Sequence, residues 1–127
     1  QERIDDRPQE FPRMNESLLG HKHEFGYFAG IANVFTQADL IKQDLAKQST
    51  QVRHDGENFG YGEPVFIARN GAKSEDDGYV MALRHNTETD LSDLVVLDAQ
   101  DFCGEPVAIV HLPARVPNGF HGNWIAD

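Results

Sequence analysis

Apolar residues along this chain gather in short runs, and clusters of turn-forming residues separate one run from the next. Several runs are rich in β-branched residues, and no window keeps its apolar residues at helical spacing over several turns. Short strands that recur about every ten residues are typical of a sandwich, a barrel or a propeller. We therefore predict an all-β fold, with strands at residues 24–35, 38–45, 51–55, 63–69, 78–86, 93–101 and 107–112.

The secondary structure of two segments is less obvious from the pattern of apolar residues. Residues 38–48 carry Leu40, Ile41 and Leu45 at helical spacing, but the turn signals on both sides favour a strand. This strand would pair with residues 51–55 as a hairpin. Residues 1–24 are polar, contain two prolines and have few strand formers, so we expect them to be mostly loop.

The length of 127 residues suits one modest domain with a single core. Propeller blades of about 40–50 residues would fit this length two or three times, whereas a closed propeller needs about four to eight blades. The chain also begins with Gln1 instead of Met, in a polar stretch without a targeting signal. A propeller interpretation therefore predicts that the chain is a piece of a longer protein.

Charge and cysteine content narrow the classes of partner. Eleven basic and 21 acidic residues give a net charge of −10, which argues against nucleic acid and against an anionic membrane surface. No apolar run approaches the length of a membrane span. Cys103 is the single cysteine, so an internal disulfide is impossible, and we expect a buried thiol in a reducing, cytoplasmic setting.

Five of the six histidines lie in polar or strand-end contexts. His21 and His23 would share one face of a strand and form a metal pair, but their neighbours are strongly polar, which favours a solvated face. Surface or strand-end positions are likewise expected for His54, His85 and His111.

His121 differs from the other histidines because it lies in the nearly uncharged segment VPNGFHGNWIAD. Gly119 and Gly122 flank the pair of Phe120 and His121, and glycine permits close backbone approach. Trp124 supplies bulk that would exclude water. A neutral imidazole in a dry, tight place suits a metal ligand, but a core histidine bonded to a backbone carbonyl fits the same pattern.

Two glutamates stand beside prolines. Glu63 precedes Pro64 and would share a strand face with Val65 and Ile67, so its carboxylate needs a partner. That partner is either solvent at the strand end or the ring N–H of a ligating histidine. Glu10 has a similar context in EFPRMN. The Asp76-Asp77-Gly78 cluster is interpreted as a turn, because the spacing of a calcium loop is absent.

Three segments together resemble the C-terminal part of the carotenoid cleavage oxygenases, a family that includes lignostilbene dioxygenases and the retinal pigment epithelium isomerase. They are EFPRMN (10–15), GEPVFIARNGAKSEDDGYV (62–80) and LPARVPNGFHGNWI (112–125). The resemblance implies a seven-bladed β-propeller with a non-haem Fe(II) on its axis, held by four histidines. It implies that His121 is the last iron ligand and that Glu63 and Glu10 are glutamates that orient ligating histidines.

The resemblance also implies a reaction, in which O₂ is inserted across a conjugated C=C bond of a carotenoid, apocarotenoid or stilbene to give two carbonyl products. Some members of the family isomerise or hydrolyse their substrates instead. The other five histidines do not match the family's ligand segments, so three ligands are expected upstream. We therefore expect residues 1–127 to be the C-terminal fragment of one propeller domain, inactive alone because one histidine makes no tight site.

Two other hypotheses remain at this point. The chain fits a non-catalytic β-domain that binds a partner and keeps His121 as a core residue. It also fits, less well, a cupin-type metalloenzyme, which needs histidines clustered on adjacent strands; only the HKH segment at residues 21–23 comes near this requirement.

Overall fold

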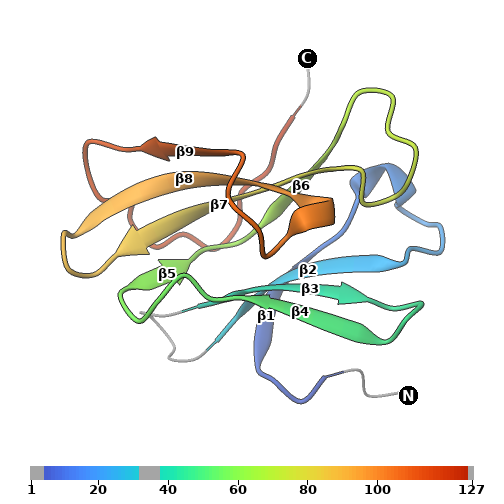
Figure 1. Cartoon of the computed structure of the whole chain (residues 1–127), viewed down its shortest axis with the longest axis horizontal. Helices are drawn as coiled ribbons and strands as arrows, with labels where there is room; N and C mark the ends of the chain where they lie inside the picture. The colour runs from blue at the N-terminus through green and yellow to red at the C-terminus, as the bar shows by residue number, and fades with distance from the viewer. Residues whose placement is uncertain (1–4, 32–37, 126–127) are drawn as a thin grey trace.

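Two antiparallel β-sheets packed face to face make up the computed structural model of the protein (Figure 1). The structure describes residues 5–31 and 38–125. The first sheet has the order β1-β2-β3-β4, with β1 at Gln9–Arg13, β2 at Phe25–Gly30, β3 at Leu40–Asp44 and β4 at Ser49–Arg53.

The second sheet has the order β5-β7-β8-β9, and β6 pairs with β7 beside β5. Its strands are β5 at Phe59–Tyr61, β6 at Val65–Ala68, β7 at Gly78–Asn86, β8 at Leu91–Asp98 and β9 at Ala108–His111. Two single turns of 3₁₀ helix complete the described elements, η1 at Glu16–Leu18 and η2 at Ala99–Asp101.

The predicted strands are confirmed, with shifts at their ends. The hairpin of β3 and β4 forms as expected, and β7 has the predicted bounds. The last residues of the predicted strand at 93–101 form η2 instead, and the part of the first predicted strand from residue 32 onward lies outside the described residues.

The prediction that residues 1–24 are mostly loop is wrong for Gln9–Arg13, which form β1. The strand tolerates Pro12 because β1 lies at the edge of its sheet, where a missing N–H breaks no ladder. The short strand β5 was also missed, since three residues between glycines give little periodic signal.

The core lies between the two sheets. Leu40 and Tyr27 point into it from the first sheet, and Val80 and Val95 do so from the second, all almost fully buried. The Tyr27 ring stacks on the Phe66 ring at 5.4 Å between centroids. Alternate residues of β7 and β8 thus face the first sheet, as the period-two pattern requires.

The EDDG segment at residues 75–78 joins the sheets through its side chains. Glu75 accepts hydrogen bonds from the backbone N–H groups of Glu24 and Phe25 at the start of β2. Asp76 pairs with the buried Lys42 of β3, with 2.8 Å between Oδ2 and Nζ. Gly78 lets β6 approach, because a Cβ there would lie 2.3 Å from the carbonyl oxygen of Ile67. The cluster is a turn, as predicted, and it also fastens one sheet to the other.

A second ionic connection between the sheets is a ladder of alternating charges that starts at Arg53 on β4. Arg53 Nε lies 2.9 Å from Asp55 Oδ1, and Arg84 Nη1 on β7 lies 2.6 Å from Asp55 Oδ2. Arg84 Nη2 continues the ladder to Asp93 Oδ2 on β8 at 2.7 Å. Each of these side chains is nearly buried, so the carboxylates are held by charged donors in a poorly solvated place.

This ladder predicts a loss of stability in acid. Burial raises the pKa of Asp55, but hydrogen bonds from Tyr61 and Arg84 outweigh it and leave the pKa below its usual range. Burial also raises the pKa of Asp93, but hydrogen bonds from Arg84 and His111 outweigh it and leave this pKa below its usual range. A lowered folded-state pKa contributes stability above the unfolded value of about 3.9, and this contribution disappears as the pH falls through the folded pKa.

We therefore expect the urea midpoint of the protein to fall steeply below a pH of about 4. Asp55→Asn should be less stable at neutral pH, and its midpoint should change less with pH. Glu88→Gln, at an exposed turn, serves as the control. An acid-dependent fall that is undiminished in both Asp55→Asn and Asp93→Asn would contradict the assignment.

Candidate metal site

The candidate site lies where an edge strand of each sheet is interrupted. In β1, the pairing with β2 shifts register between Glu10 and Arg13, and Phe11 takes a φ of 55°. In the second sheet, β5 and β6 pair with successive parts of β7 and are separated by residues 62–64. Pro64 has no N–H for the ladder, so the strand breaks at the position of Glu63.

Glu63 is the centre of the contacts at this break. Its side chain is only 7% exposed. The backbone N–H of Gly122 donates to Oε2 at 2.7 Å, and Nη1 of Arg13 donates to Oε1 at 3.3 Å. His121 Nδ1 lies 3.4 Å from the same Oε1. A buried carboxylate requires such donors, and here they come from β1 and from the C-terminal segment.

His121 is held on two sides. Glu63 meets Nδ1, and the Phe11 ring packs edge-to-face against the imidazole with 5.6 Å between centroids. Within the described part of the chain, no protein group meets Nε2, and the side chain is 76% exposed. A carboxylate on one ring nitrogen and a free second nitrogen is the arrangement of metal-ligating histidines. The geometry of His121 therefore suits a metal ligand.

The other predicted features of this segment lie differently. Trp124 is 53% exposed and does not seal His121 from water within this chain. A Cβ at Gly119 or Gly122 would meet nothing within 4 Å, so the close approach expected at these glycines is not made among residues 5–31 and 38–125. Among the described residues, the large apolar side chains of this segment, Phe120, Trp124 and Ile125, stay exposed to solvent.

Glu10 and Cys103 take no part in the contacts around Glu63. Glu10 lies on β1 opposite Ala29 with its side chain exposed, on the other side of the bulge from Arg13. Its predicted role in orienting a histidine involves none of the described histidines. Cys103 is exposed, which corrects the expected burial, because it follows η2 in a surface turn.

Sequence reasoning missed Arg13, the residue that shares Glu63 with His121. Its side chain is 16% exposed and reaches three further acceptors beyond the Glu63 carboxylate. The available signal was its place in EFPRMN, three residues after one acid and three before another. That signal is local, whereas the contacts of Arg13 span more than a hundred residues.

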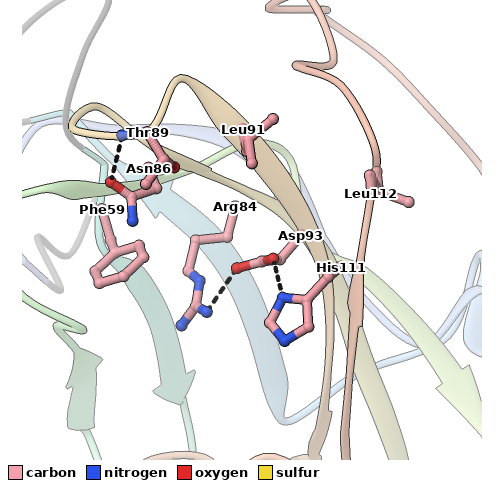
Figure 2. A pocket seen from close by; sticks show the side chains of 8 residues that line it. All are labelled: Phe59, Arg84, Asn86, Thr89, Leu91, Asp93, His111 and Leu112. Atoms are coloured by element: carbon pink, nitrogen blue, oxygen red, sulfur yellow. Dashed lines mark hydrogen bonds and ion pairs between the residues drawn. The ribbon is translucent and has the colours of Figure 1, made fainter.

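A second carboxylate–histidine pair lies across the second sheet, on β8 and the opposite edge strand β9, in a pocket of about 320 Å³ (Figure 2). His111 Nδ1 on β9 lies 2.7 Å from Asp93 Oδ1, and Asp93 also bonds Arg84. His54 and His85 similarly meet Asp39 and Asp90. Among the residues that the structure describes, no group of three or more His, Cys, Asp or Glu side chains is placed to hold a metal ion.

Comparison with solved structures defines the class of protein. The crystal structure of cobalt-substituted apocarotenoid oxygenase from Synechocystis matches 98% of this chain and 26% of its own, with a TM-score of 0.92 and 28% identity. That enzyme is a β-propeller, so the two sheets are part of a β-propeller.

The family follows from the sequence. The family described as "RPE65: Retinal pigment epithelial membrane protein" matches residues 1–126, and the chain belongs to it. A carotenoid cleavage oxygenase of Mycobacterium tuberculosis is 43% identical over 127 residues, which is 94% of this chain and 25% of that protein. Resveratrol cleavage oxygenase 1 of Botryotinia fuckeliana is 31% identical over 129 residues, or 94% of this chain and 23% of that protein.

The chain spans about a quarter of the length of the curated relatives it matches. Within residues 5–31 and 38–125, both helices are single 3₁₀ turns, and neither is long or apolar enough to span a bilayer.

Proposed function

We propose that these residues are the C-terminal part of a non-haem Fe(II) dioxygenase that cleaves a conjugated C=C bond with O₂ and releases two carbonyl products. The observation that carries the proposal is the buried Glu63 carboxylate on Nδ1 of His121, which leaves Nε2 free. Family membership adds the reaction class, and the names of the relatives supply the substrate classes: carotenoid, apocarotenoid or a stilbene such as resveratrol.

In this proposal His121 supplies one of the imidazole ligands, and histidines outside these residues supply the others. Bound iron would supply the centre at which O₂ reacts, and imidazole is a suitable donor for it. Glu63 keeps the Nδ1 proton on the ring and so directs the Nε2 lone pair towards the metal. Phe11 limits rotation of the ring from the other side. The 127 residues alone are expected to be inactive, because a single histidine binds iron weakly.

The decisive experiment uses the whole protein that contains this chain. Purified in the presence of Fe(II), it is incubated with a carotenoid, an apocarotenoid and resveratrol under ¹⁸O₂, and the products are analysed by mass spectrometry. We expect one of these substrates to give two carbonyl products and the label to appear in them. A whole protein that binds iron but converts none of the three classes, or gives a product without new oxygen, would contradict the dioxygenase assignment.

The alternative of a non-catalytic partner-binding domain required His121 in a core. Its side chain is 76% exposed among the described residues, so His121 is not part of the core between these two sheets. We also propose a cytoplasmic location on the basis of the single cysteine, and cell fractionation of the tagged whole protein tests it.

A further inference from the structure

The Arg13 guanidinium joins three separate segments of the chain beside His121. From the end of β1, Nη1 donates to Glu63 Oε1 at 3.3 Å and to the carbonyl oxygen of Gly122 at 3.1 Å. Nη2 donates to Asn123 Oδ1 at 2.7 Å and lies 3.1 Å from Glu16 Oε1. Arg13, Glu63 and His121 thus connect β1, the break before β6 and the C-terminal segment, and Arg13 is the cation among the three.

The bulge in β1 explains how one residue reaches all of these acceptors. Register with β2 changes between Glu10 and Arg13, and Phe11 sits at a φ of 55° within that interval. A bulge re-aims the side chains around it, and a residue held at positive φ marks a place where the surrounding structure maintains strain. The same bulge places the Phe11 ring on His121.

The chemistry of the guanidinium suits this position. Its five N–H donors form a rigid, planar fork that is always charged, whereas a lysine ammonium is a single point on a flexible stem. Nη1 of Arg13 donates to Oε1 of Glu63, the same oxygen that His121 Nδ1 approaches. Nη2 donates to the side chain of Asn123, two residues after His121. The orientation of the carboxylate and the path of the backbone that carries the histidine are therefore set by one side chain.

We propose that Arg13 is a positioning residue for the metal site, acting through Glu63, the backbone carbonyl of Gly122 and the side chain of Asn123 to set the orientation of His121. This inference rests on the proposed function and adds to it a residue that does not touch the metal. Loss of Arg13 leaves Glu63 without its cation in a place that is only 7% exposed. The Oε1 side of the carboxylate then loses its charged donor, so that the N–H of Gly122 and His121 alone hold Glu63. The segment after His121 also loses two of its anchors.

The test measures metal binding by the whole protein without substrate. Co(II) is titrated into metal-free protein and followed by its visible absorbance, and Fe(II) content is measured after reconstitution; cobalt is suitable because the Synechocystis relative was crystallised with it. We expect Arg13→Gln to bind Co(II) about tenfold more weakly than the parent and to show altered bands, as loss of groups that orient metal ligands does. Arg13→Lys and Asn123→Ala should each lose about threefold, since each keeps part of the network.

Arg69→Gln is the matched control. Arg69 forms comparable pairs with Asp77 and Asp98 and lies on the Tyr79 ring, but none of these residues contacts the candidate site. It should lose thermal stability without losing affinity for Co(II).

The proposal is overturned if Arg13→Gln binds Co(II) and Fe(II) like the parent and only its melting temperature falls. If Arg13→Gln does not fold, unchanged affinity in both Arg13→Lys and Asn123→Ala overturns it instead. His121→Ala in the same titration distinguishes a failure of the proposed metal role of His121 from a failure of the proposed role of Arg13. If that variant binds metal like the parent, the proposed metal role of His121 fails; if it loses binding while the Arg13 variants keep it, only the role of Arg13 fails.

Discussion

Replacing His121 by alanine in the whole protein should reduce its affinity for Fe(II) at least about 100-fold and abolish cleavage. The physical reason is that, among the described residues, nothing contacts Nε2, while the other nitrogen of the ring is held by a buried carboxylate. On the proposed assignment, removing the ring removes one metal ligand, and no other histidine among the described residues contacts Glu63.

His111→Ala is the control for this variant. His111 also carries a carboxylate on Nδ1, at 2.7 Å, and its side chain is 81% exposed, but it lies on the edge strand β9 (Figure 2). It should keep full iron content and activity. The measurements are iron per protein by elemental analysis and cleavage of the preferred substrate. Equal iron content in the two variants would contradict the assignment of His121.

Replacing Asp76 by alanine should destabilise the protein by about 3–5 kcal/mol, because it leaves the buried ammonium of Lys42 without its counter-charge. The Lys42 side chain is 5% exposed, and its remaining contacts are the carbonyl oxygen of Ala99 at 2.7 Å and the ring of Phe25. The bond between Lys42 and Asp76 joins the two sheets. The loss should appear as a lower urea midpoint, measured at pH 7 with iron content held constant.

The double variant Lys42→Met/Asp76→Ala sharpens this prediction. Removing both charges should cost clearly less than Asp76→Ala alone, since an apolar side chain of similar length suits the buried position. Lys47→Ala provides the exposed control. Its pair with Asp44 spans 3.5 Å and its side chain is 79% exposed, so the change should stay within about 0.5 kcal/mol. A double variant as unstable as Asp76→Ala would mean that packing, and not the unpaired ammonium, dominates.

Strand positions were largely predictable because they depend on neighbours in the sequence. The runs that became β3, β4, β7 and β8 alternate or are β-branched, and turn residues bound them. Strand β1 was not predictable from the sequence, because its proline and its polar residues are typical of a loop. Only its place at a sheet edge makes the strand possible there. Lys42 was missed for a similar reason, since nothing near it in the sequence indicates burial against Asp76.

The sequence by itself determined the class of fold, the family resemblance and the two residues, Glu63 and His121, that the structure brings together. Glu63 stood out because a proline follows it, and His121 stood out because it lies in a nearly uncharged segment flanked by glycines. Tertiary structure alone decided that they meet across 58 positions and that Arg13 shares the carboxylate. It also decided that the bulge at Phe11 supports the ring. The physical reason is that periodicity and turn chemistry act between neighbours, whereas hydrogen bonds and ring contacts depend on which edges the packed sheets bring together.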